Sequence, residues 1–185
     1  MQFSDISFTS SVLQTQHEKG TRERVAKRVA RQPARDRLSE KETAFISQRD
    51  SFYLATVNSE GWPYVQHRGG KPGFLQVLDS TRLSFTEELG NGEYVSLGNL
   101  RDNPRVALIL IDYPNRRRLK VFGCASVKET EQGAVHCVIE LKAFDWNCTQ
   151  CITPRYHTAA IEDMMQSLKH RILELEQQLL TQRSD

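Results

Sequence analysis

The chain has 185 residues, of which 38% are hydrophobic and 26% charged, and its formal net charge is +2. This length suits one domain with extensions, and so small a charge gives no electrostatic reason to expect nucleic acid as a partner. No apolar run approaches the ~20 residues that cross a bilayer, and the N-terminus shows no apolar signal segment. We therefore expect a cytoplasmic protein with no nucleic-acid partner and no membrane partner.

The first 38 residues predict an N-terminal helical extension, with short helices at 11–18 and 21–30. The second helix is strongly basic, but no aromatic residues alternate with its charges for stacking on bases, which favours a solvated helix face. A third helix is expected from Ser39 to about Arg49. It begins with a capping box, because Glu42 stands three residues after Ser39.

From Phe52 onward the pattern changes to short β-rich runs separated by turn residues. A short helix is expected near 94–100, ended by Asn103-Pro104. We interpret Arg116–Arg118 as a solvated hairpin loop. The predicted strands are short, joined by hairpins and mostly antiparallel, and closing them into a barrel would remove the exposed edges. They cover 52–57, 63–68, 74–78, 82–86, 105–112, 119–128 and 134–144.

A helix from about 161 to 182 ends the chain. Its apolar residues alternate spacings of four and three, which forms a seam of just under three heptads. A coiled coil with a partner subunit and packing along the chain's own barrel both satisfy this pattern. The seam consists of Ile161, Met165, Leu168, Ile172, Leu175 and Leu179.

The four cysteines are Cys124, Cys137, Cys148 and Cys151. The last two form a C-x-x-C that follows a strand pattern instead of opening a helix, and no tight second pair of ligands accompanies it. We interpret them as free thiols in a loop and expect no metal site.

Several strings, in this order and spacing, resemble the pyridoxamine-phosphate-oxidase-like flavoproteins, in particular the general oxidase-related branch. They are Phe52–Val57 with Gly61-Trp62-Pro63, His67–Gly70 with Gly73-Phe74, Leu97–Leu100 with Asn103-Pro104, and Phe144–Asn147. The resemblance implies a mainly β, α+β fold, a six-stranded split antiparallel β-barrel with peripheral helices and a long C-terminal helix. It also implies a homodimer that binds FMN between its subunits. The expected domains are 1–38, 39–155 for the FMN-binding barrel, and 156–185 for the C-terminal helix.

Three patches are candidates for binding FMN. In the family the second strand runs beside the flavin, and here its end carries donors and two glycines that permit close approach of a backbone. A short helix and the turn before it hold the phosphate in the family, as helix N-termini do. A Trp and an Arg reach the partner's flavin. These patches correspond to Gln66, His67, Arg68, Gly69, Gly70 and Lys71; to Asn91, Ser96 and Asn99; and to Trp146, Asn147 and Arg155.

The resemblance therefore implies an FMN-dependent oxidoreductase that acts on an unknown small-molecule substrate or electron donor, with no catalytic residue assigned. Oxidation of pyridoxamine phosphate itself is not expected, since a long helix follows Arg155 where the true oxidases carry a substrate-binding motif. One alternative is a flavin carrier or a redox sensor that uses Cys148 and Cys151. Another is a haem or deazaflavin binder on the same barrel.

Overall fold

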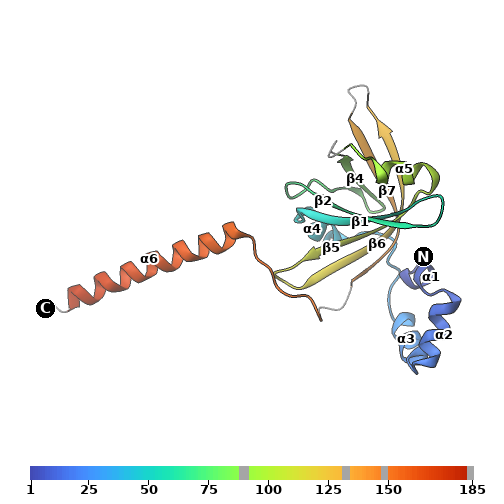
Figure 1. Cartoon of the computed structure of the whole chain (residues 1–185). Helices are drawn as coiled ribbons and strands as arrows, with labels where there is room; N and C mark the ends of the chain where they lie inside the picture. The colour runs from blue at the N-terminus through green and yellow to red at the C-terminus, as the bar shows by residue number, and fades with distance from the viewer. Residues whose placement is uncertain (88–91, 131–133, 147–149, 183–185) are drawn as a thin grey trace. The chain divides into compact units, whose positions relative to one another are not determined.

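The computed structural model describes residues 1–87, 92–130, 134–146 and 150–182. The chain divides into two compact units. The first comprises Met1–Asp112 and Arg117–Thr149, and it holds the N-terminal helices and the whole β-sheet (Figure 1). The second comprises Tyr113–Arg116 and Gln150–Asp185, and it holds the C-terminal helix.

The sheet of the first unit has seven strands in the order β2-β1-β5-β6-β7-β4-β3, and every neighbouring pair is antiparallel. The α+β split barrel is thereby confirmed, with the seven strands that the sequence pattern predicts and one more than the six that the resemblance implies. β3 is a four-residue edge strand that pairs with β4. The strand bounds are Ser51–Val57 (β1), Pro63–Gly69 (β2), Gln76–Asp79 (β3), Arg82–Glu87 (β4), Arg105–Asp112 (β5), Arg117–Glu129 (β6) and Val135–Trp146 (β7).

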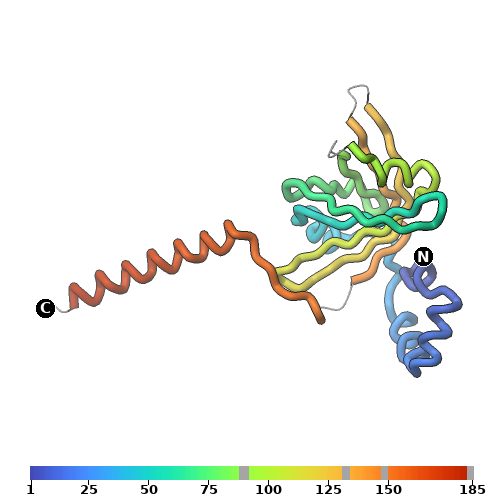
Figure 2. Tube along the Cα trace, in the orientation of Figure 1, coloured from blue at the N-terminus to red at the C-terminus, as the bar shows by residue number. Residues whose placement is uncertain are grey.

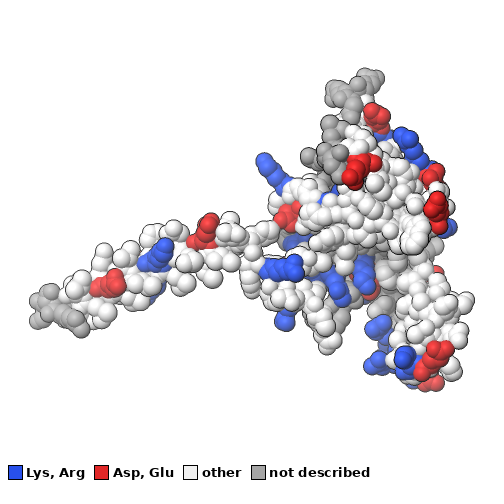
Figure 3. All heavy atoms as spheres, viewed as in Figure 1, with Lys and Arg blue, Asp and Glu red and all other residues white. Residues whose placement is uncertain are grey.

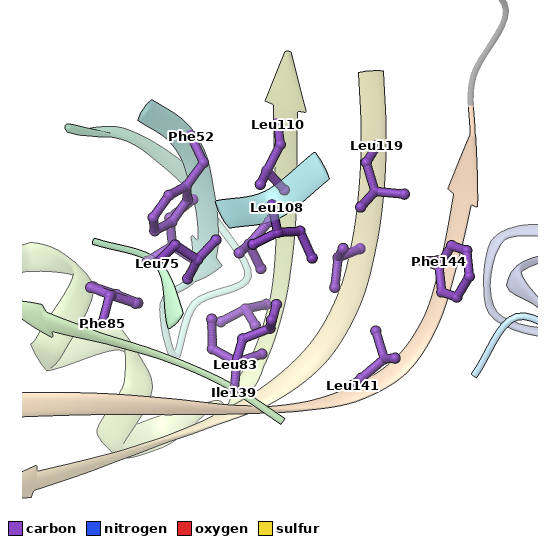
Figure 4. Close-up of a cluster of buried hydrophobic side chains, with 14 of the residues drawn as sticks. Phe52, Leu75, Leu83, Phe85, Leu108, Leu110, Leu119, Ile139, Leu141 and Phe144 are labelled. Carbon is purple, nitrogen blue, oxygen red and sulfur yellow. The ribbon is translucent and has the colours of Figure 1, made fainter. Parts of the chain in front are cut away.

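A bulge bends the longest hairpin of the sheet, β6–β7. The register shifts between Phe122 and Gly123, and a Cβ built on Gly123 would lie 2.5 Å from the side chain of Ile139. Only glycine permits this approach, and a bulge increases the local bend and twist of a strand. Figure 4 shows the result, because side chains from β1, β4, β5, β6 and β7 point toward one another on the concave side of the sheet.

Four helices precede the sheet. The trace in Figure 2 follows the first three, in blue, before the chain enters the barrel. They are α1 (Phe3–Ser7), α2 (Ser10–Glu18) and α3 (Arg22–Ala30), and α4 follows at Glu40–Ser47. The predicted capping box of α4 is confirmed in both directions between Ser39 and Glu42. The sequence pattern missed α1, whose Phe3 stacks on Phe122 of β6 with ring centroids 4.6 Å apart.

Two further helices complete the chain. The short helix α5 (Val95–Asp102) connects β4 to β5, and α6 (Thr158–Gln182) belongs to the second unit. Among the described residues, no helix combines the length and the apolar character that crossing a bilayer requires.

Candidate functional site

A cavity of about 450 Å³ lies between the end of β2, the end of β4 and the start of α5. This volume is within the range of small-molecule sites, about 300–1,000 Å³. Aromatic rings, charged groups of both signs and backbone line it together. The lining residues are Tyr64, Gln66, His67, Arg68, Gly69, Gly70, Lys71, Phe74, Gln76, Phe85, Thr86, Glu87, Glu93, Tyr94, Val95 and Ser96.

The six predicted residues at the end of β2, Gln66 to Lys71, all line this cavity. A Cβ built on Gly70 would lie 2.7 Å from the Phe74 ring, so glycine lets the ring close over the backbone. The Gly70 amide donates to the Asp50 carbonyl at 2.8 Å. Pairing with β1 thus holds this segment at the edge of the cavity, while the His67 ring meets Tyr53, 5.4 Å away between ring centroids.

A buried ion pair joins the two sides of the cavity. Arg68 Nη1 lies 2.5 Å from Glu87 Oε1, and the two side chains are only 11% and 9% exposed. Arg68 Nε and Nη2 are also buried, and neither has a hydrogen-bond partner in the structure. These two atoms form the side edge of the guanidinium, which can grip an oxyanion with two parallel hydrogen bonds. Nη1 of Arg68 is therefore paired with a carboxylate, while the Nε–Nη2 edge lacks an acceptor.

Glu87 is the main site residue that the sequence reasoning missed. Burial raises the pKa of Glu87, and the Arg68 guanidinium opposes this rise. Cys137 lies on β7, whose pairing with β4 sets it opposite Phe85. Burial, together with the charge of Glu87, raises the pKa of the Cys137 thiol to about 12. The Cys137 thiol is therefore a packed core group and not a nucleophile.

The N-terminus of α5 forms the third side of the cavity. Tyr94, Val95 and Ser96 line it, and the side chain of the N-cap residue, Tyr94, makes no capping hydrogen bond. Tyr94 occupies the N-cap with a φ of 52°, a left-handed conformation that is costly for a bulky residue and is concentrated at functional sites. Ser96 Oγ donates to Gln66 Oε1 at 2.8 Å, which ties α5 to β2. Uncapped amides at a helix N-terminus bind anions.

The remaining predicted site residues are placed elsewhere or are not described. Asn99 lies one turn beyond Ser96 in α5, where its amide donates to the buried Thr56 hydroxyl at 2.9 Å. Arg155 belongs to the second unit, with its guanidinium carbon 5.0 Å from the centre of the Tyr113 ring. Asn91 and Asn147 lie outside the described residues.

Trp146 packs at the end of β7 against α4. Its Nε1 donates to Glu42 Oε1 at 2.6 Å, and its ring meets Phe45 edge to face at 4.7 Å. Arg117 lies over the same indole, 4.9 Å from the ring centre. The interpretation of Arg116–Arg118 as a solvated loop is therefore wrong for Arg117 and Arg118, which begin β6 and are half-buried. A guanidinium stacked between aromatic rings is stabilised by cation–π attraction.

The convex face of the sheet carries a second hollow, of about 380 Å³ and mostly apolar. Outward side chains of β1, β2, β5 and β6 line it, and Phe3 of α1 covers part of it. They include Tyr53, Ala55, Val65, Ala107, Ile109 and Phe122. β1 and β5 are thus apolar on both faces, which is typical of strands in a sheet that is covered on both sides. In the described part of the chain, no group of three or more His, Cys, Asp or Glu residues could hold a metal ion.

The model of the pyridoxamine 5'-phosphate oxidase family matches residues 38–150, which is more than half of the chain. The chain belongs to this family. A search of curated proteins gave no match.

Solved structures similar to this family member include HupZ of Group A Streptococcus, which is 16% identical with a TM-score of 0.48 and covers 64% of this chain and 99% of its own. HutZ of Vibrio cholerae, described as a haem storage protein, is 18% identical with a TM-score of 0.43, and the match covers 59% of this chain and 94% of HutZ. General stress protein 26 of Bacillus anthracis is 16% identical with a TM-score of 0.44, and the match covers 58% of this chain and 91% of that protein. Likeness at this level says nothing about which ligand the family member binds.

Proposed function

We propose that this protein binds FMN in the cavity between β2, β4 and α5 and is an FMN-dependent oxidoreductase in a cytoplasmic homodimer. The observation that carries the proposal is the buried, unpartnered Nε–Nη2 edge of Arg68 beside the cavity. Burying polar donors without acceptors costs about 1–3 kcal/mol. A bound oxyanion or ring carbonyl would recover this energy.

The other donors around the cavity suit the same ligand. Lys71 offers an ammonium group, and the start of α5 offers the backbone amides of a helix N-terminus. Phe74, Phe85 and Tyr94 supply aromatic surface for a planar ring. FMN needs positive charge and amides for its phosphate and donors for its ring edge, and the bound flavin would supply hydride or single-electron transfer. The chain's own residues would hold and orient it.

The homodimer is supported by the apolar convex face of the sheet. Val65 is 61% exposed at the centre of a strand, beside the hollow that Tyr53 and Ile109 also line. An exposed apolar sheet face of this kind marks an interface. Val65→Glu is expected to weaken the dimer, as measured by light scattering coupled to size-exclusion chromatography.

The test compares FMN with riboflavin, which lacks the phosphate, by fluorescence titration of the ligand-free protein. We expect FMN to bind at least tenfold more tightly. Arg68→Lys keeps the charge opposite Glu87 but removes the bidentate edge, so it should weaken FMN binding about 10- to 100-fold. Arg82→Met is the matched control, because Arg82 pairs with Asp79 on the surface and its side chain is 55% exposed.

Equal affinity of Arg68→Lys and the unmodified chain for FMN would remove the basis of the proposal. An absorption spectrum of the purified protein separates the ligand classes, since a single intense Soret band would indicate haem instead of flavin. Rapid reduction of the bound flavin by NADH or NADPH, followed by reoxidation, would favour an enzyme over a carrier.

A further inference from the structure

The C-terminal helix α6 exposes a continuous apolar seam. None of its 25 residues is buried, and its six seam residues, Ile161 to Leu179, are between 41% and 59% exposed. In Figure 3, uncharged surface separates the few charged side chains visible along this helix. A single helix of this length is only marginally stable in water without a packed apolar face. The exposed seam therefore indicates that α6 packs against another apolar surface.

The seam fits a heptad repeat from Ile161 to Leu179, within a helix that is about 37 Å long at 1.5 Å per residue. Met165, Ile172 and Leu179 occupy the a positions, seven residues apart. Ile161, Leu168 and Leu175 occupy the d positions. A β-branched residue at the central a position with leucine at the flanking d positions is the combination typical of two parallel strands.

The charges beside the seam distinguish the two directions of pairing. In a parallel pair, a g residue faces the e residue five positions later in the other helix, so Arg171 meets the partner subunit's Glu176, twice by symmetry. In an antiparallel pair that keeps the seam in register, Arg171 meets its own copy and Lys169 meets its own copy. Glu162 then meets the partner's Glu176. Opposite charges thus favour the parallel pair, and like charges oppose the antiparallel one.

Arg171 is free to take part in such a contact. Its side chain is 61% exposed, and it already lies 3.0 Å from Glu174 of its own helix. A guanidinium has five N–H donors, so a contact to the partner subunit's Glu176 adds to the existing pair without breaking it.

We infer that α6 forms a parallel two-stranded coiled coil with the α6 of a second copy of this chain. This inference concerns the second unit and does not depend on FMN binding. It gives the homodimer an interface separate from the convex face of the sheet.

The test is disulfide trapping in the full-length chain. Cysteines at facing d positions of a parallel pair satisfy the Cα separation of a disulfide, about 4.4–6.8 Å. Leu175→Cys is therefore expected to give a covalent dimer on a non-reducing gel under mild oxidation, at low micromolar concentration. Gln177→Cys, two residues later on the outward face, is the matched control and should stay at the background of the unmodified chain.

The charges give a second readout. Arg171→Glu in the Leu175→Cys background should slow trapping severalfold, and adding Glu176→Arg should restore it. Trapping between mixed Met165→Cys and Leu175→Cys chains, but not within Leu175→Cys alone, would overturn the parallel assignment. Absence of any covalent dimer for Leu175→Cys would overturn the coiled coil. These variants leave the cavity intact, so FMN titration of the same preparations tests the proposed function separately.

Discussion

Removing Arg68 from its ion pair with Glu87 should destabilise the protein, by an amount that depends on pH. Breaking a buried pair by deleting one partner costs about 3–5 kcal/mol, and these side chains are about nine-tenths buried. Arg68→Met also deletes two donors that lack partners, Nε and Nη2, which returns about 1–3 kcal/mol. The two effects leave a net loss of about 2 kcal/mol in the free energy of unfolding at pH 7.

The pH dependence follows from Glu87. Burial already raises its pKa above the ordinary value of 4.5, with Arg68 opposing the rise, and removing Arg68 lets the pKa rise further. A carboxyl group with a raised folded pKa takes up a proton on folding. Its contribution is therefore fully present below 4.5 and is lost as the pH rises through the folded pKa. Arg68→Met should be closer to the unmodified chain at pH 4.5 than at pH 7.

Urea denaturation followed by circular dichroism at both pH values measures these losses. The double variant Arg68→Met/Glu87→Gln should lose less than the sum of the single variants, with a coupling of about 1–3 kcal/mol. Arg82→Met, at an exposed pair, should change the free energy of unfolding by less than about 0.5 kcal/mol. A loss for Arg68→Met that is the same at both pH values, together with additive single variants, would refute the reasoning.

Three further changes test the packing. Gly123→Ala places a methyl group 2.5 Å from a side chain of β7, so thermal denaturation should show a loss of about 1–3 kcal/mol in the free energy of unfolding. Gly98→Ala in α5 places a methyl group with nothing within 4 Å, so the free energy of unfolding should rise by up to about 1 kcal/mol. Cys137, with its pKa near 12, should resist iodoacetamide at pH 8 in the native protein while the exposed Cys151 reacts, as read by mass spectrometry of peptides. Trp146→Phe leaves a buried carboxylate without its indole donor and should cost about 1–3 kcal/mol in urea denaturation.

Local patterns predicted most of the fold. The alternation of β1 buries Phe52 and Leu54, and the capping box at Ser39 begins α4. The residues Gln66 to Lys71 were predicted to share a site because the family resemblance places the end of this strand beside the flavin. Ser96 could be added because the N-terminus of a helix binds anions whichever strands surround it.

Contacts that depend on the curvature of the sheet could not be predicted from local sequence patterns. β2 lies at one end of the strand order, and β4 is next to last at the other end. No hydrogen-bonded ladder joins them in the described residues, so Arg68 meets Glu87 only because the sheet curls. Arg117 was expected in a loop for a similar reason. Three consecutive arginines indicate a solvated segment, but in the structure Arg117 lies over the rings of Phe45 of α4 and Trp146 of β7.

The curvature of the sheet also places Arg68, a charged side chain that is costly to bury, in the core of the chain. Replacing both members of a buried ion pair by apolar side chains of similar volume is often neutral or stabilising, so the Arg68–Glu87 pair is weak evidence of a purely structural role. Natural cores avoid such groups unless something else uses them. Here Arg68 is one of the residues that line a cavity, together with the N-terminus of α5 and aromatic rings. Glu87 fixes the direction of Arg68 without occupying its bidentate edge, so Nε and Nη2 of Arg68 form a preset pair of donors. The free-energy cost of burying these two donors without acceptors in the ligand-free protein is what a bound acceptor would offset.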